Sequence, residues 1–91
     1  MKYDVIWTDK ATDDALMLQE NEPKSYEKLS KLVDELYEHP RTGTGKPEIL
    51  KGNLKGKWSR KISSKHRLVY EIRDKIVTVS IVSAYGHYDD K

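Results

Sequence analysis

The chain has 91 residues, of which 36% are hydrophobic, with no cysteine and a formal net charge of +2. This length predicts a single domain over residues 1–91 with a modest core, and the lack of cysteine excludes a disulfide framework and a thiolate metal site. No apolar run approaches the ~18 residues of a membrane span and the N-terminus does not resemble a signal peptide, so we expect a cytoplasmic protein without membrane attachment.

Charge is distributed unevenly along the chain. Residues 1–40 carry five basic and ten acidic side chains, whereas residues 41–91 carry twelve basic and five acidic ones. Between Arg41 and Arg67 there are nine basic side chains and one acid, Glu48. Such a basic run predicts a polyanion site, because phosphates attract clustered lysine and arginine. A lone carboxylate would repel those phosphates, so its presence favours a role for Glu48 as a base.

The first forty residues predict one strand and two helices. Alternation over residues 2–7 predicts a strand, and Thr8 is a suitable N-cap for a helix over residues 9–21. A second helix is predicted from Pro23, which suits a first turn, up to Pro40, which cannot follow a helical residue easily. Its apolar stripe is expected to be core, so the two helices should form a hairpin that covers a sheet.

The second half of the chain predicts a loop and three strands. Residues 40–47 have the glycine and proline content of a loop. Alternating or β-branched patterns predict strands over residues 57–63, 66–72 and 76–82, and the last is expected to be the central strand. The order βαα followed by three antiparallel strands predicts an α+β domain with two helices packed on one sheet.

Alternation also assigns side chains to the two faces of these strands. In residues 57–63, one set comprises Trp58, Arg60 and Ile62, and the other comprises Ser59, Lys61 and Ser63. For Trp58 and Tyr70, packing in the core or on the sheet is favoured over stacking on RNA.

Two familiar kinds of site are not supported. Gly45-Lys46 suggests a phosphate-binding P-loop, but Pro40 stands where that motif needs glycine and Pro47 where it needs serine or threonine. No pair of carboxylates or histidines has a metal-ligand spacing on one element. We therefore expect neither a metal nor another cofactor.

Four residues supply the groups that metal-free RNA cleavage needs: Glu48, Arg67, His87 and Tyr88. A base removes the proton of the ribose 2′-OH, a cation stabilises the pentacoordinate phosphate, and an acid protonates the leaving 5′-oxygen. Glutamate or histidine can be base or acid, arginine suits the phosphate, and tyrosine can stack on a nucleobase.

Each of these residues also has a plainer interpretation. Glu48 could be a solvated loop acid, and Arg67 could be the ion-pair partner of Glu71. His66 is interpreted as an ordinary surface or strand histidine, outside the catalytic set. His39 suits the C-terminal end of a helix, where its charge would interact with the helix dipole.

Four motifs make a family resemblance specific. They are Gly45-Lys46-Pro47-Glu48-x-Leu50-Lys51, Asn53-Leu54-x-Gly56-x-Trp58-Ser59-Arg60, His66-Arg67-Leu68-Val69-Tyr70 and the near-terminal His87-Tyr88. With these motifs the whole chain resembles the Txe/YoeB family of toxins, within the RelE superfamily of bacterial type II toxin–antitoxin modules. The resemblance implies a small microbial-RNase-like fold and ribosome-dependent cleavage of mRNA in the A site without a metal.

The resemblance also implies a role for each matching residue. Glu48 becomes the general base, Arg67 the transition-state stabiliser, His87 the general acid, and Tyr88 a group that positions the substrate. The expected RNA contacts are Lys46, Lys51, Arg60 and Lys61. The implied partners are a separate antitoxin protein, the 70S ribosome with its mRNA, and a second copy of the chain in a homodimer.

Two departures and two alternatives accompany the resemblance. Asp89-Asp90-Lys91 follow the His-Tyr pair at which such toxins typically end, and Lys57 and Lys61 stand where an aromatic residue and an arginine are common. One alternative function is a toxin that binds RNA or the ribosome without cutting. The other is a ParE-like toxin that poisons DNA gyrase, although such relatives generally lack the glutamate, arginine and His-Tyr set.

Overall fold

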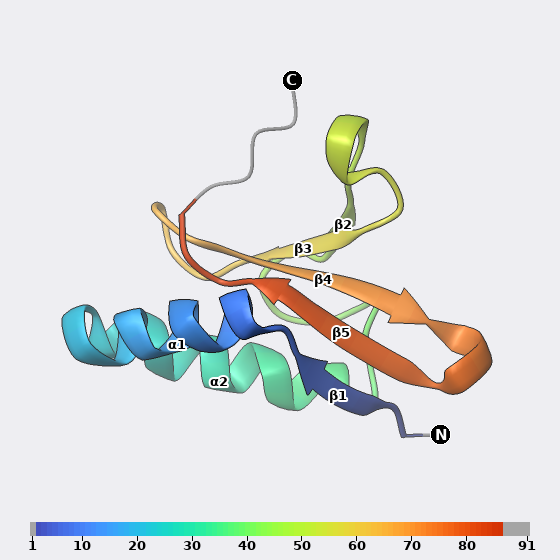
Figure 1. Cartoon of the computed structure of the whole chain (residues 1–91), viewed down its shortest axis with the longest axis horizontal. Coiled ribbons are helices and arrows are strands. Elements are labelled where there is room, and N and C mark those ends of the chain that lie inside the picture. Colours follow the sequence, from blue (N-terminus) through green and yellow to red (C-terminus); the bar gives the residue numbers. More distant parts are fainter. Residues whose placement is uncertain (1, 87–91) are drawn as a thin grey trace.

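Two helices pack on one face of a five-stranded mixed sheet in the computed structural model, which describes residues 2–86 (Figure 1). In chain order the elements are β1 (Asp4–Trp7), α1 (Asp9–Asn21), α2 (Pro23–Leu36), β2 (Glu48–Ile49), β3 (Trp58–Lys61), β4 (Arg67–Arg73) and β5 (Thr78–Ser83), with 3₁₀ turns at Gly52–Leu54 and Asp74–Ile76. The predicted α+β fold, with both helices on one side of the sheet, is confirmed.

The strand order within the described residues is β1-β5-β4-β3-β2. β1 runs parallel to β5, and the other neighbouring pairs are antiparallel. The prediction that residues 76–82 form the central strand is therefore wrong: β5 is interior, but β4 is the middle strand. The reason is β2, a two-residue strand that sequence patterning did not predict and that adds an edge beyond β3.

The helix boundaries follow local hydrogen bonds. The Thr8 hydroxyl caps α1 by accepting a hydrogen bond from the Ala11 backbone N–H at 3.1 Å, and it donates to the Ile81 carbonyl at 2.9 Å. The predicted N-cap is thus confirmed, and it also joins the start of α1 to β5. α2 ends at Leu36, before the predicted limit, and beyond it the Glu35 carbonyl accepts hydrogen bonds from both the Glu38 N–H at 3.2 Å and the His39 N–H at 2.7 Å.

The core lies between the helices and the sheet. Its buried members come from both helices and from β4, β5 and their flanks: Ala11, Leu18, Leu29, Leu32, Val33, Leu36, Ile62, Leu68, Tyr70, Val79, Ile81 and Ala84. Tyr70 is wholly buried and Trp58 packs partly buried against this cluster, which confirms that packing explains both aromatic residues. Within residues 2–86 no helix combines the length and the apolar character needed to cross a membrane.

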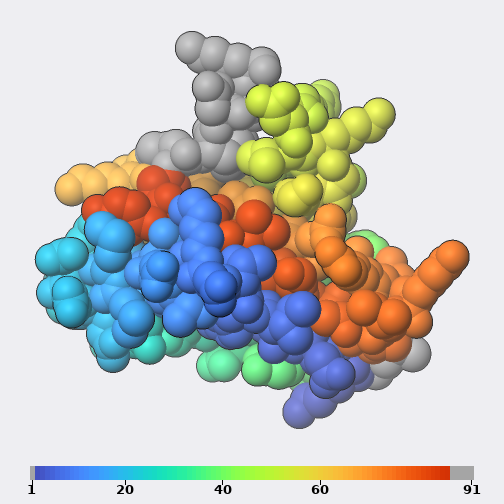
Figure 2. All heavy atoms as spheres, in the orientation of Figure 1, coloured from blue at the N-terminus to red at the C-terminus, as the bar shows by residue number. Residues whose placement is uncertain are grey.

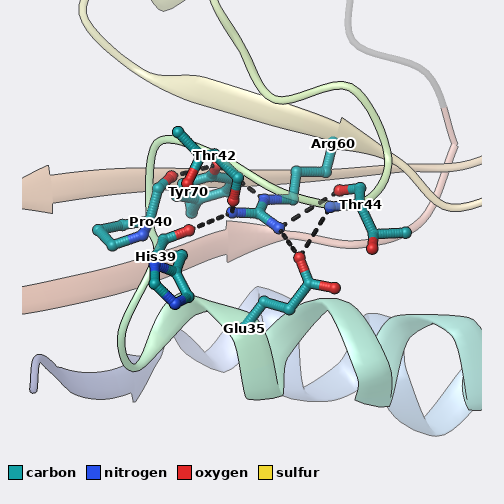
Figure 3. A network of polar contacts seen from close by, with 7 residues as sticks. All are labelled: Glu35, His39, Pro40, Thr42, Thr44, Arg60 and Tyr70. Carbon is teal, nitrogen blue, oxygen red and sulfur yellow. Dashed lines mark hydrogen bonds and ion pairs between the residues drawn. The ribbon is translucent and has the colours of Figure 1, made fainter.

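A charged side chain also lies in this interior. Arg60 on β3 is 0% exposed, and its guanidinium points between β4, α2 and the loop after α2 (Figure 3). A guanidinium has five N–H donors, and here all five are used. The acceptors are the Tyr70 hydroxyl at 3.1 Å, a Glu35 carboxylate oxygen at 2.7 Å, and the backbone carbonyls of His39 at 2.5 Å, Thr42 at 2.8 Å and Thr44 at 3.3 Å.

Glu35 completes the charge balance of this network. Its Oε1 accepts hydrogen bonds from Arg60 and from the Thr44 backbone N–H at 2.8 Å. Partial burial alone would raise the pKa of Glu35, but the hydrogen bonds from Thr44 and Arg60 outweigh it and lower that pKa below its ordinary value. The buried cation therefore faces an ionised carboxylate, which is the arrangement that makes its burial tolerable.

Two glycines let the loop after α2 pass close to this network. Gly43 has φ +118°, and a Cβ there would collide with the Glu35 carboxylate. Gly45 has φ +83°, and its carbonyl accepts a hydrogen bond from the Lys61 backbone N–H at 2.7 Å. Residues with a side chain rarely adopt such φ values. Glycine at both positions therefore allows the loop to follow its path along β3 toward β2.

We expect Arg60→Met to lower the free energy of unfolding by about 3–5 kcal/mol, because it leaves an acidic partner and several carbonyls without donors. Lys61→Met, on the exposed neighbouring residue, should change it by only about 0.5 kcal/mol. Urea denaturation of both variants measures the difference. Equal stability of the two variants would contradict the structural role of Arg60.

The lowered pKa of Glu35 predicts a pH dependence of stability. The stabilisation is fully present above pH 4.5, the ordinary value for this carboxyl, and is lost as the pH falls through the lower folded-state pKa. Glu35→Gln should therefore be less stable than wild type at pH 7, and the gap should narrow below pH 4.5. Urea denaturation at several pH values tests this. Glu38→Gln, which removes an exposed acid of the same loop, serves as the control for the loss of one negative charge.

Candidate functional site

Glu48 and Arg67, far apart in sequence, meet in the structure. Glu48 begins β2 and Arg67 begins β4, and Arg67 Nη1 lies 3.6 Å from Glu48 Oε1. Their side chains are 53% and 27% exposed, respectively, so a ligand can reach both. The plainer alternative, in which Arg67 is the ion-pair partner of Glu71, does not match the structure, since Glu71 lies beside Lys57 at 3.9 Å and Arg73 at 2.8 Å.

Strand register places this pair on the sheet face opposite the helices. Leu68 and Tyr70 of β4 belong to the core, so Arg67 and the other odd-numbered residues of that strand point the other way. Lys61 is directly opposite Arg67 on the neighbouring strand, and Glu48 is directly opposite Ser59. Directly paired residues share a face, so three adjacent strands contribute to one polar surface.

Three predicted RNA-contact lysines, Lys46, Lys51 and Lys61, are exposed. Lys46 directly precedes the Pro47-Glu48 step and has a left-handed φ of 51°. Lys51 follows β2 and leads into the Gly52–Leu54 turn, which projects away from the helices (Figures 1 and 2). The structure thus places one lysine on each side of β2 in sequence and one on the strand that pairs with it.

The prediction that Arg60 contacts RNA is not supported by its position in the structure. Its side chain is wholly buried on the helix-facing side of the sheet, and its five N–H groups are already used within the protein. It cannot bind a phosphate without dismantling the network around Glu35. Arg60 is therefore a structural residue, and the basic surface is made by the lysines and Arg67.

His87 and Tyr88, the predicted general acid and substrate-positioning residue, lie outside the described residues, as does the tail formed by residues 89–91. The last described residue is Gly86, whose carbonyl accepts a hydrogen bond from the Arg67 backbone N–H at 3.0 Å. Up to this point, the chain that leads to His87 is held beside the strand that carries Arg67.

His66 is more than the plain strand histidine that the sequence suggested. Its side chain is 5% exposed, Nε2 lies 2.7 Å from a Glu22 carboxylate oxygen, and Nδ1 accepts the Gly86 backbone N–H at 2.8 Å. The ring packs against Tyr85 with 4.5 Å between centroids. One signal was available: His66 is in phase with Leu68 and Tyr70, which places it on the core side of the chain.

The contact with His66 lowers the pKa of its acidic partner, Glu22. The hydrogen bond with His66 is the main cause that lowers the pKa of Glu22 below its ordinary value.

As for metal binding, no group of three or more histidine or acidic side chains suited to an ion is found among residues 2–86.

Comparison with known proteins identifies the family. Residues 7–88 match the family model described as YoeB-like toxin of bacterial type II toxin-antitoxin system. Toxin YoeB of Escherichia coli K12 is 40% identical over 84 residues, which covers 92% of this chain and 98% of that protein.

Solved structures agree. A YoeB/ParE toxin from Agrobacterium tumefaciens superposes with a TM-score of 0.86 at 33% identity, covering 93% of this chain and 99% of that one. YoeB from Staphylococcus aureus, solved as a dimer and in complex with YefM, gives TM-scores of 0.81 and 0.80 at 34% identity, covering 97% of this chain and 100% of that one. The chain therefore belongs to the family of YoeB-like toxins of bacterial type II toxin–antitoxin systems.

Proposed function

We propose that the chain is a ribosome-dependent endoribonuclease that cleaves mRNA in the A site and so inhibits translation. The observation that carries this proposal is the Glu48–Arg67 pair, with an accessible carboxylate oxygen and guanidinium nitrogen 3.6 Å apart on the sheet face opposite the helices, near exposed lysines. A base and a phosphate-binding cation have to act within a few ångströms of each other, because the 2′-OH and the scissile phosphate are neighbours in RNA.

The chemistry needs no metal. The Glu48 carboxylate takes the proton of the 2′-OH, whose oxygen forms a new bond to phosphorus while the bond from phosphorus to the 5′-oxygen breaks. Arg67 stabilises the negative charge that develops on the phosphate oxygens, for which its planar fork is suited. The products are a 2′,3′-cyclic phosphate and a 5′-hydroxyl end.

The leaving 5′-oxygen requires a proton donor. Resemblance to the family assigns this role to His87 and the positioning of the substrate to Tyr88, and we keep both assignments in the proposal. Neither a metal ion nor another cofactor enters this scheme.

The exposed lysines supply the electrostatic part of substrate binding. Lys46, Lys51 and Lys61 surround the strand that begins with Glu48, and each can neutralise one phosphate of mRNA or ribosomal RNA. A single scissile phosphate does not need so many cations, so we include the 70S ribosome among the proposed partners.

The proposed protein partners follow from the solved relatives. Staphylococcus aureus YoeB has been solved both with YefM and as a dimer. We infer that this chain likewise binds a cognate antitoxin, that it forms a homodimer, and that it acts in the cytoplasm where translation takes place.

We expect Glu48→Gln to slow cleavage strongly while the protein still folds, because an amide cannot accept the 2′-OH proton. The rate of cleavage on programmed 70S ribosomes should fall by about 10²–10⁴-fold. Glu27→Gln, on an exposed acid of α2, is the control and should cleave like wild type.

Mapping the new 5′ ends in the mRNA tests the proposed function itself. Translation inhibition by wild type without such ends would favour a non-cleaving inhibitor, and inhibition of DNA gyrase would favour a ParE-like toxin.

A second prediction concerns the salt dependence of ribosome binding. We expect the affinity for ribosomes to fall less steeply with salt when Lys46, Lys51 and Lys61 are replaced by alanine. The slope of log affinity against log salt concentration should become less negative by about 2, which is ~0.7 for each lost phosphate contact. The matched control replaces three lysines of α2, Lys24, Lys28 and Lys31, and so removes the same charge from another face. If both variants changed the slope equally, net charge rather than the proposed surface would govern binding.

A further inference from the structure

The segment that leaves β5 is held by buried polar side chains at alternating residues. Asp14 of α1 is 6% exposed, and its Oδ2 accepts the Ala84 backbone N–H at 3.0 Å. Two residues later, His66 Nδ1 accepts the Gly86 N–H at 2.8 Å. Regular pairing between β4 and β5 extends only to Val69 and Ser83. Beyond this point the segment is held by these two side chains and by a single backbone hydrogen bond, from the Arg67 N–H of β4.

These contacts define the protonation state of the His66 ring. A nitrogen that accepts a backbone N–H carries no proton, so in this structure the proton is on Nε2. From there it is donated to the Glu22 carboxylate at 2.7 Å. The neutral Nε2–H tautomer thus links the turn between α1 and α2 to the end of the described chain.

Both polar groups of Gly86 are held by two consecutive residues. His66 binds its N–H through the side chain, and Arg67 binds its carbonyl through the backbone N–H at 3.0 Å. Gly86 has φ +79°, a conformation that favours glycine and changes the direction of the chain. A change in His66 would therefore alter how this turn is placed relative to Arg67.

We propose that His66 is a positioning residue for the reaction: it fixes Gly86 beside Arg67 and so sets where the chain that continues into His87 leaves the sheet. This inference rests on the proposed function, in which Arg67 and His87 act on the same phosphate. A misplacement of about 1 Å in such a site can slow a reaction by roughly a hundredfold.

Two amide variants separate the two contacts of His66. The asparagine amide oxygen sits one bond from Cγ, as Nδ1 does, so His66→Asn keeps an acceptor for Gly86 and loses the contact with Glu22. The glutamine amide sits one bond further, as Nε2 does, so His66→Gln keeps a donor to Glu22 and loses the Gly86 acceptor. The two variants therefore differ in which end of the link they break.

The experiment measures single-turnover cleavage on programmed 70S ribosomes over a range of ribosome concentrations, with thermal unfolding of each variant. We expect His66→Gln to lose roughly tenfold to a hundredfold in the saturated rate with little change in the half-saturating concentration. His66→Asn should stay within about threefold of wild type even if it unfolds at a lower temperature. A rate that follows thermal stability in both variants, or is unchanged in His66→Gln, would overturn the inference.

A measurement on the unmodified protein is independent of cleavage. Nitrogen NMR of the wild-type imidazole should show an unprotonated Nδ1, and the Gly86 amide should exchange slowly with solvent. A protonated Nδ1 at neutral pH, or rapid exchange, would refute the contact itself. If wild type failed to cleave mRNA, the proposed function and this inference would both fall, whereas cleavage by wild type and His66→Gln alike would overturn this inference alone.

Discussion

The buried guanidinium of Arg60 is the constraint on which the path of the chain into the site depends. A charge in the interior is tolerated only when every donor is paired, because an unpaired ion retains the full penalty of leaving water. Here the acceptors come from α2, β4 and the loop after α2, so those segments have to meet at one point (Figure 3). The loop is then bonded to β3 by the Gly45 carbonyl and continues directly into Glu48. The position of the proposed base thus follows from a network on the other side of the sheet.

The two faces of the sheet give neighbouring residues opposite roles. Arg60 and Lys61 are both cations, yet Arg60 is wholly buried beneath the helices and Lys61 is exposed on the opposite side of the sheet. His66 and Arg67 likewise point to opposite sides of the sheet. The His66 imidazole contacts Glu22 between the two helices, and the Arg67 guanidinium contacts Glu48 on β2. A side-chain period of two residues is the cause. A count of the basic residues in a segment therefore overestimates the number of cations that a polyanion can reach.

Sequence patterns predicted both helices and four of the five strands, β1, β3, β4 and β5, because each contains several turns or alternations of apolar residues. β2 has only two residues and exists through its pairing with β3, which leaves no periodic signal to detect. The structural role of Arg60 could have been predicted, since it alternates in phase with Trp58 and Ile62, but its charge and its place in a family motif favoured a phosphate contact. The approach of Glu48 to Arg67 was implied by resemblance alone, because it depends on the register across β2, β3 and β4.

That register also bears on how the pair would bind a phosphate in the proposed reaction. At 3.6 Å the contact is an ion pair beyond hydrogen-bond range, so the two groups are close without a tight bond to each other. A tight bidentate pair would have to be broken before a phosphate could bind, and its energy would oppose binding. In the proposed reaction, the looser contact at 3.6 Å leaves less interaction energy to be lost when the phosphate binds. The strand that carries Arg67, β4, also holds Gly86 through the Arg67 backbone N–H. One strand therefore positions both the Arg67 guanidinium and the residue from which the chain continues toward His87.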